Sequence, residues 1–362
     1  MGAHPPPLPF AGRGETILKK SSRPIARPVM AYGAVNSQQG IALITAVLIT
    51  ALISIIAVTM ISEQQLDIRR TGNILDRAQA WQFALGMEAI AMLALRKDAE
   101  NNKTDHRMED WGKPIQFPAP DGAEGDMISG RIEDLQGRFN LNNLVNAERK
   151  IDPLQLKQFK RLLSLLDLPP GLAERVADWI DAGSTPHGLD GAEDDEYSRL
   201  DPPYRTGNTQ LVTPAELLLI VSREEYQKLE KFVAVLPSRE KTHINVNTAP
   251  KEVLASLEYV SSADIDELLR EREQLEKQNS KGFDKIDDVL ELPAFRALKE
   301  QHPEFAQYFK ECCKITSDFF LVTVFAQFDK GEVTLRSLLK RSTSGDSKRE
   351  RVLTVLRTQG DY

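Results

Sequence analysis

The sequence predicts an α+β protein in which a long N-terminal helix packs on an antiparallel sheet, with a large all-α domain inserted between the strands. Three observations predict this fold class. An apolar run of membrane length covers residues 41–61, and a block with helical periodicity covers about 151–310. β-Branched and aromatic segments separated by turn residues then fill 311–362, as expected for antiparallel strands.

The apolar run carries no charged side chain before Glu63. About 20 apolar residues cross a bilayer as a helix, so we expect a transmembrane helix over 41–62. An ordinary secretory signal has a shorter apolar region and ends in small residues, which this run does not. A plain anchor and a prepilin-type segment, cleaved after Gly40 and kept as the start of a helix, remain as alternatives, and Gly40 directly before the run favours the second.

The first 40 residues form a basic, proline-rich leader that we expect to be unstructured. It carries net charge +4, which predicts a cytoplasmic N-terminus and a single-pass protein with its bulk outside. Met1 and Met30 both remain candidate starts, and a start at Met30 would leave no basic side chain in the leader. The basic residues are Arg13, Lys19, Lys20, Arg23 and Arg27, against one acid, Glu15.

Helical periodicity continues after the apolar run to about Lys97. Apolar residues recur there at spacings of three and four, which predicts one face that packs on the soluble domain. The predicted stripe is Ile74, Ala78, Trp81, Leu85, Ala89 and Met92.

Three strings in this region, at residues 40–45, 64–70 and 78–86, resemble the GspK family, the large minor pseudopilins of type II secretion. The string at 134–144 resembles a hallmark of the same family. The resemblance implies a pilin-like fold and a non-enzymatic role at the tip of the secretion pseudopilus, which the protein would help to initiate during export of folded proteins across the outer membrane. It also implies that a prepilin peptidase cuts after Gly40 and methylates the new amine of Ile41.

The partners implied are other minor pseudopilins of the GspI, GspJ and GspH types, the major pseudopilin and the inner membrane, with secreted substrates and the secretin as further candidates. Thr45 adds a detail, because most pilin-like proteins carry glutamate at this fifth position after the cleavage site. A carboxylate in lipid is costly without a partner, so its loss fits a subunit with no neighbour above it. The alternative is that Thr45 is a tolerated small polar residue.

The composition restricts the function further. The whole chain carries −7 and the leader +4, so the rest carries −11, which argues against nonspecific nucleic-acid binding. The two cysteines, Cys312 and Cys313, are adjacent, and we expect apolar packing rather than a strained bridge between neighbours. The sequence contains no HExxH, GxSxG, Walker or GxGxxG motif.

The predicted domains follow from these patterns. The rest of the long helix and the first part of the α/β domain occupy 63–150, with a strand at 127–133, and a strand-turn-strand is expected over 134–144. The helical insert divides into submodules at about 151–240 and 241–310, with helices expected at 153–166, 172–180, 214–220 and 224–235. Three C-terminal strands are expected at 315–328, 332–340 and 351–358.

An acidic, glycine-containing loop over 181–197 is the candidate metal site. Clustered carboxylates repel unless a cation or solvent screens them, and Ca²⁺ prefers six to eight such oxygen ligands. From the residues alone, a solvated acidic loop is favoured over a calcium site. The resemblance to the GspK family implies that this loop binds calcium. The expected ligands are Asp181, Glu193 and Asp194, with Asp190 or Asp201 as further candidates.

A second resemblance gives the main rival function. Residues 244–250 resemble the start of the helix-hairpin-helix domains of membrane-anchored competence proteins, which bind DNA. The hairpin at 257–264 lacks the glycines whose N–H groups would meet phosphate and carries Glu258 and Asp264. We therefore expect no nucleic-acid partner, and keep a type IV pilus or competence component and an anchored hydrolase as alternatives.

Overall fold

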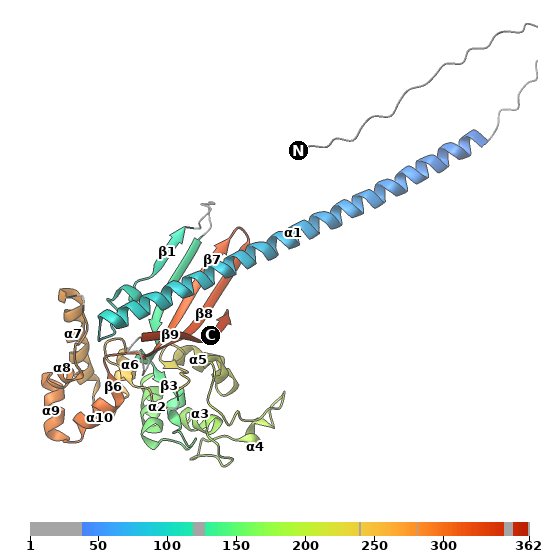
Figure 1. Cartoon of the computed structure of the whole chain (residues 1–362). Coiled ribbons are helices and arrows are strands. Elements are labelled where there is room, and N and C mark those ends of the chain that lie inside the picture. Colours follow the sequence, from blue (N-terminus) through green and yellow to red (C-terminus); the bar gives the residue numbers. More distant parts are fainter. Residues whose placement is uncertain (1–37, 119–126, 239, 280, 344–349, 361–362) are drawn as a thin grey trace, which may run out of the picture. The chain divides into compact units, whose positions relative to one another are not determined.

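The computed structural model describes residues 38–118, 127–238, 240–279, 281–343 and 350–360 (Figure 1). The basic leader residues and both candidate starts lie outside this part of the chain. The chain divides at Leu66 into two units, and helix α1, Gln38–Asn101, contributes to both.

The first unit is described from Gln38 to Leu66 and consists of the apolar part of α1. Its apolar side chains are exposed throughout, as expected of a helix surrounded by lipid, and α1 is long and apolar enough to cross a membrane. The few hydroxyls in the run bond to backbone carbonyls three or four residues earlier, which leaves no unpaired donor facing lipid. These are Thr45, Thr50, Ser54, Thr59 and Ser62.

The second unit contains a five-stranded antiparallel sheet with the order β1-β2-β7-β8-β9. The three C-terminal strands form the predicted meander, and the predicted strand at 127–133 is β2. An additional edge strand, β1, had no signal in the sequence. The bounds are Ile115–Pro118 for β1, Met127–Asp134 for β2, Phe319–Phe328 for β7, Gly331–Thr343 for β8 and Glu350–Gln359 for β9.

The C-terminal part of α1 packs on this sheet (Figure 1), which confirms the predicted fold class. The predicted apolar stripe is correct in part. Trp81, Leu85 and Met92 are partly buried and pack against the core of this unit, whereas Ile74, Ala78 and Ala89 are exposed. The buried face consists mainly of small side chains, which let the helix approach the sheet, while bulkier residues flank the contact. The buried residues are Ala80, Ala84, Met87, Ala91 and Leu95.

A close approach at the β7–β8 turn reinforces this packing. A Cβ atom on Gly331 would lie 2.6 Å from the backbone of α1 at Asp76 and Arg77. The turn and the helix backbone are therefore in direct contact, and only glycine fits between them.

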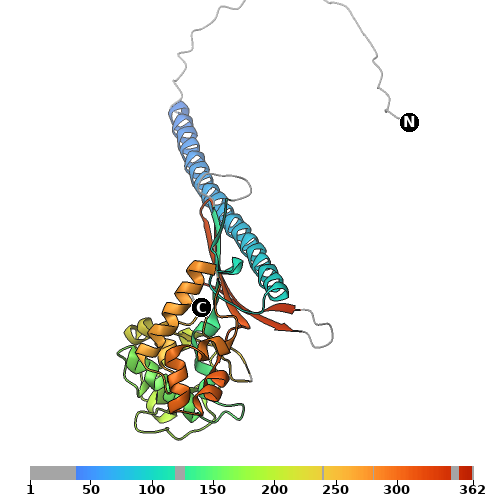
Figure 2. The same cartoon turned by 90° about the vertical axis from the view of Figure 1, so that its left-hand side faces the viewer.

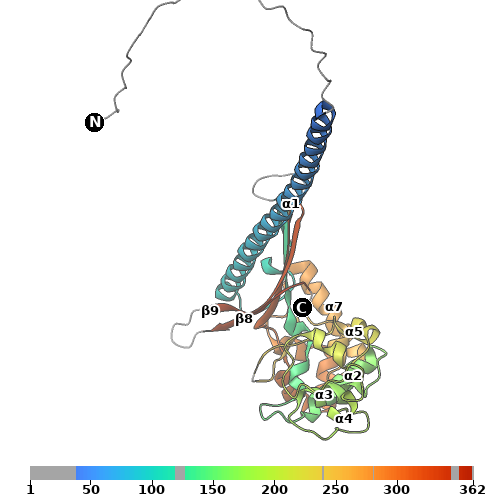
Figure 3. The same cartoon turned by 90° about the vertical axis from the view of Figure 1, so that its right-hand side faces the viewer.

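The helical domain interrupts the chain between β2 and β7, two neighbouring strands whose ends pair at Asp134 and Phe320. Its helices gather beyond that end of the sheet rather than over its faces (Figures 2 and 3). The first two predicted helices are present as α2, Pro153–Leu165, and α3, Leu172–Ile180. The third is a 3₁₀ helix, η4, Pro214–Leu219, and the fourth is shorter than predicted, α5, Arg223–Leu229.

The remaining helices of the domain are short except for one. They are α4, Asp194–Tyr197; α6, Lys251–Ala255; α7, Ser262–Asn279; α8, Ile286–Leu290; α9, Pro293–Gln301; and α10, Phe305–Cys312. All of them share one apolar core with α2 and α3. The two neighbouring cysteines are free thiols, and Cys313 is buried in β6, Cys313–Lys314, which pairs with β5, Ile244–Asn245.

The segment 134–144 is a buried connection between the sheet and the helical domain. It does not form the expected strand-turn-strand. The short strand β3, Phe139–Asn140, pairs in parallel with β4, Val233–Ala234, and lies between 3₁₀ turns η2, Leu135–Gly137, and η3, Leu141–Leu144. The Asn142 side chain bonds to the backbone of Leu211 in both directions, at 2.9 and 3.1 Å. The Asn142 amide thus satisfies buried backbone groups of the loop around Leu211.

Candidate functional site

The predicted processing site lies in the first turn of α1. Gly40 and Ile41 are both exposed, and 65% of Ile41 is accessible. The Thr45 hydroxyl donates to the carbonyl of Ala42 at 3.0 Å. Thr45 therefore satisfies its own polar group within the helix, whereas a glutamate at this position would need a partner from outside it.

The acidic loop begins where α3 ends and is organised by a carboxylate that the ligand prediction did not include. Asp178 is fully buried, and its oxygens accept the backbone N–H groups of His187 and Ala192, the latter at 2.9 Å. Gly191 is required beside it, because a Cβ there would collide with the Asp178 carboxylate. The sequence signal for this role was the pair of acids Glu174 and Asp178, four residues apart among the apolar side chains of one helix face.

Glu193 has the electrostatic properties of a cation ligand. Only 5% of it is exposed, and its Oε1 has no hydrogen-bond partner in the described part of the chain. Burial raises the pKa of Glu193 to about 7, and the charges of Asp178, Asp181 and Asp194 add to the rise. A buried carboxylate with an unpaired oxygen among other carboxylates is costly, and a hard cation would remove that cost. The chemistry of Glu193 therefore fits calcium, but among the described residues Asp181, Glu193 and Asp194 do not bring three carboxylate oxygens within 4.8 Å of one another.

The other predicted ligands lie in different surroundings. Asp194 accepts bonds from the N–H and hydroxyl of Thr206, at 3.0 and 2.9 Å. Asp181 accepts the N–H of Gly183 at 3.0 Å, which closes a turn at the loop entry. Asp190 points away from the loop entry, with its carboxylate against Gly171 at the start of α3, and Asp201 is exposed.

The helix-hairpin-helix segment uses its two acids in structural contacts. Asp264 accepts the N–H and the hydroxyl of Ser261, both at 2.7 Å, at the start of α7. Glu258 pairs with Lys157 of α2. Both carboxylates occupy the hairpin where a phosphate-binding turn would need free N–H groups.

A membrane-length helix that continues onto an antiparallel sheet, with a helical domain set between two strands, defines the pseudopilin class with an enlarged soluble part. Two family models, both described as type II secretion system (T2SS), protein K, match residues 137–238 and 244–307. The chain belongs to the type II secretion system protein K family.

Curated relatives carry the same description. The protein of Pseudomonas aeruginosa is 40% identical over 265 residues, covering 70% of this chain and 76% of the relative. The protein of Dickeya chrysanthemi is 28% identical over 368 residues, covering 90% of this chain and 98% of the relative. A solved GspK-GspI-GspJ complex from enterotoxigenic Escherichia coli contains a chain that matches with a TM-score of 0.66 and 25% identity, covering 81% of this chain and 100% of that one.

Proposed function

We propose that this protein is the minor pseudopilin at the tip of a type II secretion pseudopilus, where it initiates assembly and helps to export folded proteins. The observation that carries the proposal is the match to the whole of a chain in a GspK-GspI-GspJ complex. Its partners are then minor pseudopilins of the GspI and GspJ types, with GspH-type and major pseudopilins below. Its role is structural rather than enzymatic.

The apolar run of α1 supports a single-pass position in the inner membrane. The basic leader keeps the N-terminus in the cytoplasm, so the bulk of the protein lies in the periplasm. Prepilin peptidase removes the leader after Gly40 and methylates Ile41. Thr45, with its hydroxyl bonded inside the helix, lets the subunit lie outermost.

Mass spectrometry of the protein extracted from membranes tests the processing step. The expected mature N-terminus is N-methylated Ile41, and Gly40→Ala in the same cells should retain the leader. A mature protein that starts at any other residue contradicts this part of the proposal.

Co-purification tests the position in the assembly. The chain should form a stable complex with GspI- and GspJ-type pseudopilins, and should not do so with minor pilins of a type IV pilus from the same cell. The reverse preference would favour the type IV alternative.

Thr45→Glu should reduce secretion while Thr45→Val, which removes only the hydroxyl, should leave secretion unchanged.

We also propose that the acidic loop binds Ca²⁺ through Asp181, Glu193 and Asp194, with Asp190 and Asp201 as outer candidates. The unpaired buried oxygen of Glu193 supports this. The ion would add to the bonds that already hold the loop between α3 and α4, which run from Asp178 to His187 and Ala192 and from Glu174 to Asp190.

Calorimetry of the full chain in detergent with Ca²⁺ tests the loop site. Glu193→Ala and Asp194→Ala should each remove the heat of one binding event. Glu224→Ala, which changes an exposed carboxylate on α5, is the matched control and should bind as the unmutated protein does. Absence of heat in the unmutated protein would end this proposal and leave the secretion role untouched.

A further inference from the structure

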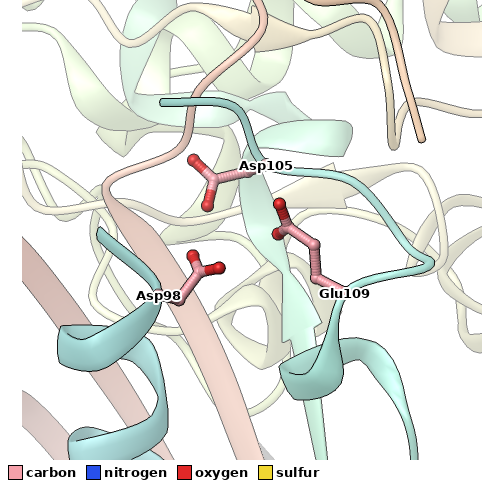
Figure 4. Close-up of side chains that lie close together, drawn as sticks. All are labelled: Asp98, Asp105 and Glu109. Atoms are coloured by element: carbon pink, nitrogen blue, oxygen red, sulfur yellow. The ribbon is translucent and has the colours of Figure 1, made fainter. Parts of the chain in front are cut away.

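A second group of carboxylates lies at the C-terminal end of α1, where the helix meets the chain that leads into the sheet. Asp98 comes from the last turn of α1, and Asp105 and Glu109 come from the segment that follows. Figure 4 shows the three carboxyl groups turned toward one another. One oxygen from each lies within 4.8 Å of the other two. This convergence could not be predicted from the sequence, because no spacing motif links the three residues.

Arg341 of β8 compensates for only part of this negative charge. Its guanidinium donates to Asp98 at 3.2 Å and also to Asp105. When all three carboxyl groups are ionised, as metal ligands are, one guanidinium leaves two negative charges. His106 Nε2 lies 3.5 Å from Glu109 Oε1, so this imidazole borders the cluster.

Lysines also lie nearby but do not bond to the cluster in the described part of the chain. Lys97 and Lys281 line the adjoining cavity together with Asp110, so the positive and negative charges around that cavity offset one another in part. The same cavity is bordered by Asp98, Asn102 and Glu109. It gives water and small ions a route to the carboxylates.

An independent observation is the unsatisfied oxygen of Asp105. Only 1% of this residue is exposed. Its Oδ2 accepts the N–H of Ser317 at 2.7 Å and a bond from Arg341, whereas its Oδ1 has no hydrogen-bond partner among the described residues. Buried polar atoms are nearly always paired, so this oxygen indicates a ligand that the polypeptide itself does not supply.

We propose that Asp98, Asp105 and Glu109 bind a hard divalent cation of the calcium type, at a site separate from the acidic loop. All three ligands are carboxylate oxygens, which hard cations prefer. Two oxygens that each lie about 2.3–2.6 Å from Ca²⁺ can be at most about 5 Å apart, and the observed separations fall within that limit. The two positive charges of the ion would balance the two negative charges that remain after Arg341 has paired with the carboxylates. Water from the cavity would complete the coordination.

The position of the site gives the ion a structural role. Its ligands join the end of α1 to the following segment, and through Arg341 and Ser317 to β8 and the start of β7. A bound ion would fix the point at which the membrane-derived helix is attached to the sheet.

Terbium(III), a luminescent substitute for Ca²⁺, tests the site because a tryptophan lies beside it. The indole N–H of Trp111 donates to Glu109, so excitation of Trp111 should sensitise a bound terbium ion. The protein is the full chain in detergent carrying Glu193→Ala and Asp194→Ala, which removes the loop site near Trp179. We expect terbium emission that Ca²⁺ displaces, a loss of at least tenfold in affinity in Glu109→Gln and Asp105→Asn, and full retention in Asp110→Asn, whose side chain is exposed.

Trp111→Phe separates binding from its signal. This variant should lose the emission yet retain one equivalent of calcium by elemental analysis after dialysis, and Ca²⁺ should still raise its melting temperature. The proposal is overturned if the unmutated cluster binds no ion by elemental analysis, or if Glu109→Gln and Asp105→Asn, folded by circular dichroism, bind terbium as tightly as Asp110→Asn does. In either case the carboxylates are balanced by protons rather than by metal.

Discussion

Glu88 shows how one residue secures α1 to the sheet. Its carboxylate is buried and accepts a bidentate pair of bonds from Arg357 of β9, at 2.7 and 2.9 Å, and further bonds from Ser337 of β8 and Thr354 of β9, both at 2.6 Å. Burial by itself raises the pKa of Glu88, but these four bonds outweigh it and lower the pKa. The charged form therefore stabilises the folded state above pH 4.5, and that contribution is lost as the pH falls through the lowered pKa.

Replacement of this carboxylate should be costly. Glu88→Ala leaves Arg357 and two hydroxyls without their acceptor, and we expect a loss of about 2–3 kcal/mol in the free energy of unfolding. Glu100→Ala on the same helix breaks only the exposed pair with Arg96 and should cost less than about 1 kcal/mol. Chemical denaturation of the full chain in detergent measures both, and equal losses would show that the Glu88 bonds contribute nothing specific.

Helix α1 has an exposed apolar surface in its N-terminal part and a face buried against the sheet in its C-terminal part. Up to Leu66 its apolar side chains are exposed, and from Ala80 onward one face of small residues is buried against the sheet. Because alanine has little volume, the backbone of α1 approaches the strands closely, as its contact with Gly331 also shows. The contact tolerates little added volume.

A matched pair of substitutions on α1 tests this packing. Ala84 is fully buried and Ala89 is exposed, although both were apolar positions in the sequence. Ala84→Leu should destabilise the protein by about 1–3 kcal/mol through overpacking, while Ala89→Leu should stay within about 0.5 kcal/mol of the unmutated protein. Thermal melting reports the difference, and a larger effect at Ala89 would contradict the observed face.

Among the described residues, six carboxylates share a direction of pKa shift, since burial also raises the pKa of Asp134 and Asp318. Burial raises the pKa to about 6 for Asp98 and Asp178, to about 7 for Glu193 and to about 8 for Glu109, with neighbouring carboxylates adding to each shift. The folded state then holds protons that the unfolded chain has released. These carboxylates therefore make folding stability fall as the pH rises from about 5 to 8, against a smaller opposite contribution from His106 and His243, whose pKa values burial lowers.

Divalent cations should reverse this fall, because binding displaces those protons. In chelator, the melting temperature should decrease between pH 5 and pH 8, and Ca²⁺ should restore it most strongly at pH 8. Glu193→Gln combined with Glu109→Gln should flatten both dependences. A melting temperature in chelator that rises over this pH range would contradict the prediction.

The sequence predicted the elements that depend on local pattern. The apolar run, α2, α3 and the three C-terminal strands follow from periodicity and turn residues, and α3 was predicted at its observed bounds. The phase of the buried face of α1 could not be read, because Ala84 and Ala89 look alike until the sheet is placed against one of them. Strand β1 was missed because an edge strand of four residues depends on its pairing with β2.

The candidate sites also divide into those that a local sequence pattern reveals and those that only tertiary contacts create. The acidic loop was visible because its carboxylates are close in the sequence. The cluster of Asp98, Asp105 and Glu109 gains its meaning from Arg341, more than 200 residues away in the chain, and from burial that no local pattern specifies. Asp178 was visible as an acid, but its role as the organiser of the loop depends on backbone N–H groups that only the folded loop brings to it.

The adjacent ends of β2 and β7 have a consequence for evolution and for engineering. Asp134 and Phe320 face each other across one antiparallel ladder, so the chain leaves and re-enters the sheet through a gap that a short hairpin could close. In an ancestral chain this junction would tolerate the gain of a module, since the strands on either side keep their register whatever is spliced between them. A present-day experimenter could exchange that module between species, provided that the exchange keeps the apolar contacts of Ala234 and Leu236 with Phe319 and Leu321 of β7.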